Sequence, residues 1–151
     1  MTRSGQASQC VFCDAQTQDE GRALIVAERP SAFVILNLYP YNSGHVMVVP
    51  RRHVNTLAAL EPDELGEIAA LTRQSEIALT RAYAPEGINV GINLGRPAGA
   101  GIADHLHVHL VPRWAGDTNF MTVVGQVRVL PEELPQTAIR LRAIFAELVR
   151  G

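Results

Sequence analysis

The sequence contains no lysine, since all 13 of its basic residues are arginine. Schiff-base catalysis and the phosphate-binding lysine of a P-loop are therefore excluded. No apolar run approaches the ~18 residues that a membrane-spanning helix needs. The chain also opens on polar residues, without the hydrophobic stretch of a signal peptide. We therefore expect a cytoplasmic protein with no membrane partner.

An excess of positive charge is missing too, because 15 acidic residues face 13 basic ones. A nucleic-acid-binding protein would show a basic excess or stripe, so we expect no nucleic-acid partner. Hydrophobic residues make up 47% and charged residues 19% of the chain, which excludes disordered, collagen-like and coiled-coil proteins. A length of 151 residues suits one domain. We expect a flexible tail at residues 1–9 and a single domain over residues 10–151.

Cysteine is scarce, and the two cysteines, Cys10 and Cys13, are separated by only two residues. A pair this close, in a chain without a signal peptide, does not resemble a disulfide framework. Metal binding, a redox pair and two buried thiols remain open as interpretations.

The order of the predicted elements favours an α+β fold with an antiparallel sheet over alternating βαβ units. Short β-branched runs separated by turn residues predict strands, and the sequence Glu61-Pro62-Asp63-Glu64 predicts the start of a long helix that ends at Pro85. The predicted strands are Arg22–Ala27, Ala32–Leu38, Gly44–Pro50, Ile88–Leu94, His105–Val111 and Met121–Val129, and a closing helix is predicted over Ala138–Val149.

Three of the five histidines, His105, His107 and His109, alternate with apolar residues. This period of two predicts a strand with one imidazole face and one apolar face. The three side chains cannot share one metal ion, because residues i and i+4 of a strand lie about 13 Å apart and zinc ligands lie about 2.1 Å from the metal. At least one histidine therefore has another role. Attack on phosphorus by neutral imidazole is a natural one.

A glycine-rich segment, Gly95–Gly101, precedes the histidines and contains Arg96. Its glycines allow backbone N–H groups to turn towards a phosphate. The segment is neither a P-loop nor a dinucleotide-binding fingerprint, because the required lysine and the last glycine are missing. A plain connection between two strands is the alternative interpretation.

The run His105-Leu-His107-Val-His109-Leu-Val matches the histidine-triad (HIT) pattern His-φ-His-φ-His-φ-φ at every position. The run Gly44-His45-Val-Met-Val-Val-Pro50 resembles the family's other signature strand. The resemblance extends from Cys10 to about Gly125, so the single domain over residues 10–151 is expected to be a HIT domain. The segments around Asn37–His45 and Pro112–Met121 resemble the bacterial branch of diadenosine tetraphosphate phosphorylases and HIT hydrolases.

The resemblance implies an α+β HIT fold with a five-stranded antiparallel sheet, one long central helix and a C-terminal helix. It also implies a homodimer across which the sheet continues. The implied partner is a purine nucleotide or a dinucleoside polyphosphate. The implied activity is nucleotidyl transfer or hydrolysis that cleaves dinucleoside polyphosphates such as diadenosine tetraphosphate, with phosphate or water as acceptor. A non-catalytic, zinc-stabilised nucleotide-binding protein and a hydrolase of nucleoside phosphoramidates are the alternatives.

The resemblance gives each triad histidine a role. His107 attacks the α-phosphorus and forms a nucleotidyl-histidine intermediate, and His109 contacts the phosphate or the leaving-group oxygen. His105 completes the catalytic set. The substrate-binding residues implied are Asn37 at the ribose, His45 at the phosphate, Asn93 near the α-phosphate or the leaving group, and the backbone of Gly99 and Gly101.

One position departs from the family pattern. Many members carry glutamine four residues before the first triad histidine, followed by serine or threonine. Here these positions hold Gly101 and Ile102. Backbone N–H groups are therefore expected to replace a side-chain contact with the leaving group.

His53 resembles the third ligand in zinc-containing HIT proteins and in the related galactose-1-phosphate uridylyltransferases, in which the first triad histidine completes the site. The resemblance implies structural Zn²⁺ bound by Cys10, Cys13, His53 and His105, and no organic cofactor. The alternative is a reduced cysteine pair with His53 on the surface.

Overall fold

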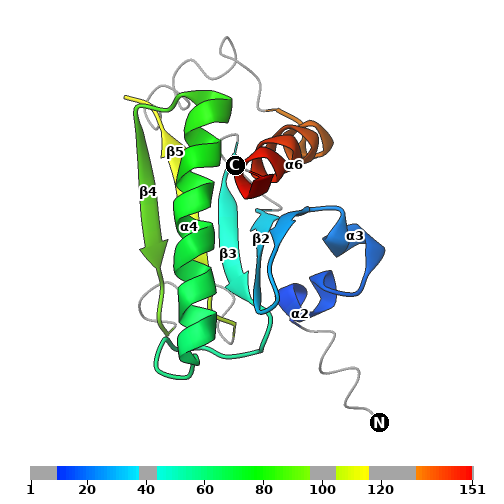
Figure 1. Cartoon of the computed structure of the whole chain (residues 1–151), viewed down its shortest axis with the longest axis vertical. Helices are drawn as coiled ribbons and strands as arrows, with labels where there is room; N and C mark the ends of the chain where they lie inside the picture. The colour runs from blue at the N-terminus through cyan, green and yellow to red at the C-terminus, as the bar shows by residue number, and fades with distance from the viewer. Residues whose placement is uncertain (1–9, 38–43, 96–104, 116–131, 151) are drawn as a thin grey trace.

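The computed structural model describes residues 10–37, 44–95, 105–115 and 132–150 (Figure 1). The helices in these ranges are α2 (Val11–Ala15), α3 (Asp19–Arg22), α4 (Pro62–Tyr83) and α6 (Leu134–Arg150). The strands are β1 (Ile25–Glu28), β2 (Ala32–Leu36), β3 (Val46–Pro50), β4 (Gly87–Ile92) and β5 (Val108–Arg113). The predicted tail at 1–9 and the strand predicted at Met121–Val129 lie outside the described residues.

The five described strands form one sheet in the order β1-β2-β3-β5-β4, and every neighbouring pair is antiparallel. Strands β3 and β5 are adjacent although α4 and β4 separate them in the chain. Val46 pairs with Leu110 and Met47 pairs with His109. The sheet therefore brings the segment around His45 next to the triad histidines. The predicted α+β fold with its five-stranded antiparallel sheet is confirmed.

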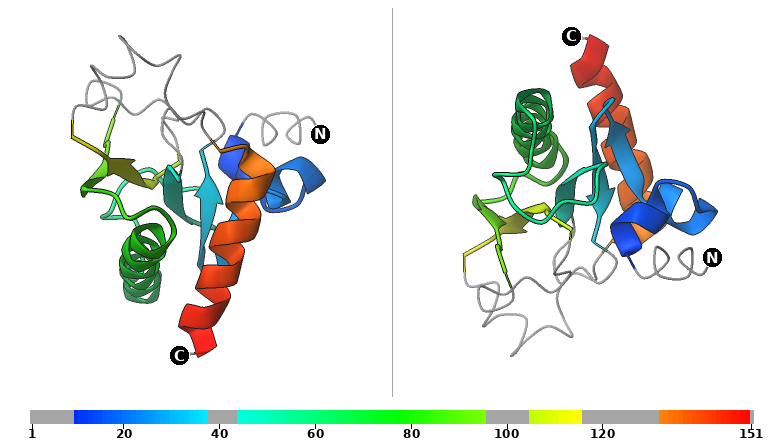
Figure 2. Two further views of the ribbon diagram at one scale, coloured as in Figure 1. Left: turned by 90° about the horizontal axis from the view of Figure 1, so that it is seen from above. Right: turned by 90° about the horizontal axis from the view of Figure 1, so that it is seen from below.

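Helices α4 and α6 cover one face of the sheet, as the end-on views show (Figure 2). The larger core lies between them and the strands, where Val34, Val48 and Leu110 pack against Leu79 of α4 and Leu141 of α6. Alternation along the strands leaves a second apolar cluster on the other face, where Phe33, Ile35, Met47 and Val49 pack with Phe12 of α2. The histidine side of β5 belongs to this second face, because His109 pairs with Met47.

The long helix α4 begins as the sequence predicts. Glu61 is its N-cap, Pro62 occupies the first turn, and the Glu64 carboxylate accepts a 2.7 Å hydrogen bond from the Glu61 backbone N–H in a capping box. The helix ends where Ala84 adopts the left-handed conformation, with φ of 47°, immediately before Pro85. Helix α6 begins at Leu134, four residues earlier than predicted.

Strand β5 begins at Val108, three residues later than predicted. The reason lies in its neighbour, because Pro50 at the end of β3 has no N–H with which to extend the ladder. The backbone N–H of Leu106 instead donates to the carbonyl of Val54 at 2.7 Å. His105 and His107 therefore lie on the segment that leads into the strand.

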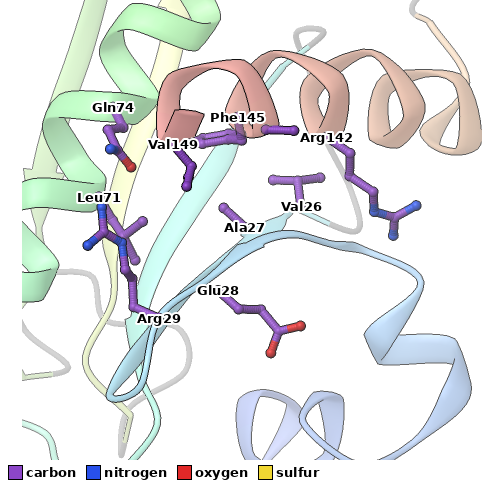
Figure 3. Close-up of a pocket in the computed structure, with 10 residues that line it drawn as sticks. Val26, Ala27, Glu28, Arg29, Leu71, Gln74, Arg142, Phe145 and Val149 are labelled. Carbon is purple, nitrogen blue, oxygen red and sulfur yellow. The ribbon is translucent and has the colours of Figure 1, made fainter. Parts of the chain in front are cut away.

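Helix α6 meets β1 and α4 at a shallow hollow, seen in Figure 3, where Phe145 and Val149 of the helix lie near Val26 of the strand. The buried Phe145 belongs to the core on the α4 side of the sheet. The hollow is therefore on the face opposite to the histidines. Among the helices in the described ranges, none combines the length and apolarity that crossing a bilayer demands.

Candidate functional site

Two cysteines and two histidines from distant parts of the sequence meet beside the sheet. The ligand atoms of Cys10, Cys13, His53 and His105 all lie within 4.8 Å of one another. The sulfur of Cys10 is 3.2 Å from Nδ1 of His105, and the sulfur of Cys13 is 3.3 Å from Nδ1 of His53. In a tetrahedral zinc site, ligand atoms are about 3.4–3.8 Å apart. The cluster therefore has the ligand types and the spacing to hold a metal ion.

The tautomer of His105 also suits metal binding. His105 is 1% exposed, and its Nε2–H donates to the Pro50 carbonyl at 2.8 Å, which leaves the lone pair of Nδ1 facing the sulfurs. Burial and the neighbouring Cys10 thiol raise the pKa of Cys13 to about 12. Without a cation the thiol therefore keeps its proton, and a bound metal would stabilise the thiolate instead.

Local structure explains how the cysteines reach this place. Cys10 is the N-cap of α2, and its sulfur accepts a hydrogen bond from the backbone N–H of Cys13. A helix of five residues is too short to give a periodic apolar pattern, so the sequence does not predict α2. On the other side of the cluster, Arg52 anchors the segment that contains His53 to helix α4. Its guanidinium donates two hydrogen bonds of 2.7 Å to the Glu64 carboxylate at the start of α4.

His107 lies immediately beyond this cluster and is 5% exposed. Its Nδ1 is 2.9 Å from the backbone carbonyl of His105. A carbonyl only accepts hydrogen bonds, so Nδ1 carries the proton and Nε2 carries a lone pair. Burial lowers the pKa of His107 below its usual value, which keeps the ring neutral at pH 7. The arrangement makes Nε2 of His107 able to act as a nucleophile or a base.

Phe12, between the two cysteines, contacts both histidines. Its ring centroid is 5.4 Å from that of His105 and 5.0 Å from that of His107, and its side chain is 1% exposed. Phe12 is not among the site residues predicted from the sequence, where its position inside the Cys-x-x-Cys segment is the only signal for a role. Its contacts place the cysteine segment directly against the ring of His107.

His109, His45 and Asn37 form a second polar group on neighbouring strands. Nδ1 of His109 is 3.1 Å from Nε2 of His45, and Nδ1 of His45 is 2.8 Å from the amide nitrogen of Asn37. Gly44 precedes His45 with φ of 86°, where a Cβ atom would come within 2.7 Å of the Tyr83 ring. Only glycine fits this approach, and it sets the direction in which the chain enters β3.

Of the remaining substrate-binding candidates, Asn93 lies within the described residues. Ile92, the last residue of β4, pairs with Val108, and Asn93 and His107 are the residues next to this pair on the two chain segments. Asn93 therefore lies at the His107 end of the ladder. Gly99 and Gly101 lie outside the described residues.

The site thus has a Cys₂His₂ cluster on one side of His107 and a His–His–Asn chain on the other. A family model of the HIT domain matches residues 18–116. The chain belongs to the HIT family. The two cysteines of this HIT protein precede the matched range, whereas His45, His53 and the triad fall inside it.

Comparisons with individual HIT proteins agree with this membership. An AP-4-A phosphorylase of Mycobacterium tuberculosis is 47% identical over 122 residues, which cover 81% of this chain and 62% of that protein. The chain therefore spans 62% of the length of that relative. An uncharacterized HIT-like protein of Saccharolobus solfataricus is 32% identical over 113 residues, which cover 74% of this chain and 79% of that protein.

Solved structures of HIT proteins share the fold. A Zn-bound histidine triad family protein from Mycobacterium smegmatis superposes with a TM-score of 0.73 at 26% identity, covering 95% of this chain and 98% of its own. A hypothetical histidine triad nucleotide-binding protein from Sulfolobus tokodaii gives a TM-score of 0.74 at 26% identity, covering 93% and 95% of the two chains.

Proposed function

We propose that this HIT protein is an enzyme that cleaves dinucleoside polyphosphates, such as diadenosine tetraphosphate, by transferring a nucleotidyl group to His107. The observation that carries the proposal is the hydrogen bond from Nδ1 of His107 to the carbonyl of His105. It leaves the Nε2 lone pair of a neutral imidazole available for attack. The 47% identity to an AP-4-A phosphorylase supports the choice of substrate.

The reaction runs in two steps. Nε2 of His107 attacks the α-phosphorus, a P–N bond forms, and the P–O bond to the leaving nucleotide breaks with its electron pair on that oxygen. With diadenosine tetraphosphate the leaving group is ATP, and His107 carries AMP. An acceptor then attacks the same phosphorus and releases His107. Phosphate as acceptor yields ADP, and water yields AMP.

The neighbouring side chains bind the substrate. His109 donates a hydrogen bond to a phosphate or leaving-group oxygen, and His45 lies behind it at 3.1 Å. Asn37 lies at the ribose and Asn93 at the leaving-group side. Neutral rings suit this site because imidazole attacks phosphorus only when a nitrogen lone pair is free. Burial lowers the pKa of both His107 and His109 and so favours the neutral rings.

We infer that the metal of the Cys₂His₂ cluster is zinc, held by Cys10, Cys13, His53 and His105. Two thiolates and two imidazoles are a zinc donor set. With four protein ligands the ion would keep no open position, so it would supply cross-linking rather than Lewis-acid chemistry. Within the chain, the cluster fixes α2 against the segment that carries His107.

We further propose a homodimer in which the sheet continues through β4. This strand is an edge of the sheet. Val90 on it is 53% exposed, and it lines the same hollow as Leu65 of α4, which is 48% exposed. At the other edge, Arg142 of α6 donates to the carbonyl of Ile25 in β1. The open apolar edge is therefore the one that suits pairing with a second copy. Val90→Arg is expected to give a monomer by sedimentation velocity, whereas Ile139→Arg on α6, which changes a residue that is also exposed, keeps the dimer.

The function is tested by analysing the products from diadenosine tetraphosphate with and without orthophosphate, beside His107→Ala. ADP and ATP formed only with phosphate identify a phosphorylase, and AMP and ATP formed without phosphate identify a hydrolase. His107→Ala is expected to bind the nucleotide and to lose turnover. Nucleotide binding by the wild type without cleavage of diadenosine tetraphosphate or of a nucleoside phosphoramidate would overturn the proposal in favour of a binding protein.

A further inference from the structure

Three side chains, on or directly beside three neighbouring strands of the sheet, form a single hydrogen-bonded series. Asn37 directly follows β2, His45 directly precedes β3, and His109 lies on β5. The backbone N–H of Asn37 also donates to the carbonyl of His45 at 3.0 Å, so the first two members are joined through backbone and side chain. The order Asn37–His45–His109 therefore follows the order of the strands.

Asn37 sets the direction in which the hydrogen bonds of this series run. The amide nitrogen of Asn37 only donates, so Nδ1 of His45, at 2.8 Å, accepts and bears no proton. Neutral His45 then carries its proton on Nε2, which donates to Nδ1 of His109 at 3.1 Å. The neutral ring of His109 in turn carries its proton on Nε2. The amide group of Asn37 therefore determines, through two hydrogen bonds, which nitrogen of His109 presents a proton.

The surroundings keep both rings neutral. Burial, together with the neighbouring His109 and His107, lowers the pKa of His45 to about 4. Burial and His107 lower the pKa of His109 as well. In the described part of the chain, the titratable groups that lower the pKa of His45 are His109 and His107, and the one that lowers the pKa of His109 is His107. No carboxylate in that part is hydrogen-bonded to His45 or His109.

We propose that Asn37 is a positioning residue that fixes His109 in the Nε2–H tautomer, so that His109 offers a hydrogen-bond donor to an anionic phosphate oxygen without being protonated. The proposal rests on the proposed function for the identity of the oxygen that His109 meets. Hydrogen bonds that ran in the opposite direction would leave a lone pair on Nε2 of His109 facing that anion. A neutral donor of this kind keeps working at pH values at which an imidazolium would be lost.

The first test reads the tautomers directly and needs no substrate. Two-dimensional ¹⁵N–¹H NMR of the full chain, labelled at histidine, distinguishes Nδ1–H from Nε2–H rings. His45 and His109 are expected as Nε2–H tautomers at pH 7–8. An Nδ1–H tautomer at His109 in the wild-type protein overturns the proposal, whether or not the protein cleaves diadenosine tetraphosphate.

The second test reverses the direction of the hydrogen bonds with Asn37→Asp. This substitution keeps the side-chain shape but replaces the donor with an acceptor. The carboxylate accepts a hydrogen bond from Nδ1–H of His45, so a neutral His45 would have a lone pair on Nε2. Nε2–H of His109 is therefore retained only while His45 is an imidazolium. Cleavage by this variant is therefore expected to fall by about tenfold per pH unit once His45 deprotonates, whereas kcat of the wild type stays level between about pH 7 and 9. Gln74→Glu, on the other face of the sheet, adds the same charge and is expected to keep the level profile.

A role of Asn37 in ribose binding alone gives a different pattern. KM then rises in Asn37→Asp and Asn37→Ala, kcat and its pH profile stay unchanged, and the His109 tautomer is the same in all variants. That pattern would overturn the positioning role and leave the proposed function intact. Absence of cleavage in the wild type together with the expected tautomers would instead contradict the proposed function alone.

Discussion

The backbone carbonyl of His105 accepts a 2.9 Å hydrogen bond from Nδ1 of His107, while the imidazole of the same His105 faces the two cysteine sulfurs. One residue thus belongs to both the metal-binding cluster and the support of the candidate nucleophile. Its carbonyl fixes the tautomer of His107, and its ring fixes where that carbonyl lies. A change in the cluster should therefore alter the hydrogen bond that fixes the tautomer of His107.

Metal binding should depend on the four cluster residues alone. We expect one zinc ion per chain by elemental analysis, and a loss of this zinc in Cys13→Ser and in His53→Gln. At a free zinc concentration about 1,000 times Kd, occupancy stabilises the native state by about 4 kcal/mol, so both variants should unfold at lower temperature. His45→Gln is the matched control and should retain the zinc. Wild-type protein purified without chelator and lacking stoichiometric metal would refute the cluster's role.

Phe12 should affect turnover beyond its effect on stability. Phe12→Ala removes a buried ring and should lower the free energy of unfolding by about 3–5 kcal/mol. Because the ring contacts His107, kcat should also fall at temperatures at which the variant stays folded. Phe145→Ala, in the core on the other face of the sheet, should cost similar stability with unchanged kcat. Equal kcat values for the two folded variants would show that Phe12 only fills space.

The ion pair between Arg52 and Glu64 should give a pH-dependent part of the stability. The Glu64 side chain is 8% exposed, and the hydrogen bonds from Arg52 lower its pKa to about 2. A depressed carboxyl pKa stabilises the fold above the unfolded value of about 4.5, and this contribution is lost as the pH falls towards 2.

Glu64→Gln should therefore lower Tm by a few degrees at pH 7, and the difference from the wild type should shrink as the pH falls from about 5 to 2. Glu147→Gln, which removes an exposed ion pair, should leave Tm within error at every pH. A difference at Glu64 that does not depend on pH would contradict the ionic origin of its effect.

Much of the fold was predictable because local patterns carry it. Short β-branched runs between turn residues predicted most of the strands, and Pro62 with the acidic residues around it predicted the start of α4. The His-x-His-x-His spacing put three imidazoles on one side of one segment. The four residues of the cluster were predicted as one metal site from the resemblance to the HIT family. The structure brings those four side chains together.

The details of the site depend on contacts that no local pattern contains. The start of β5 depends on Pro50, which is far away in the sequence, and the tautomer of His109 depends on His45, 64 residues earlier. The place of Phe12 depends on a short helix that sequence periodicity does not predict. These are tertiary relationships, so the sequence indicated the residue types but not which nitrogen carries each proton.

The central claim is that His107 becomes covalently nucleotidylated, and trapping that species tests it most directly. Wild-type protein is mixed with diadenosine tetraphosphate, quenched with denaturant within the first turnover, and examined by intact-mass and peptide mass spectrometry under conditions that preserve P–N bonds. We predict one acid-labile AMP group on the peptide that contains His107, and none in His107→Gln. An unmodified His107 during active cleavage, or continued cleavage by His107→Gln, would contradict the account.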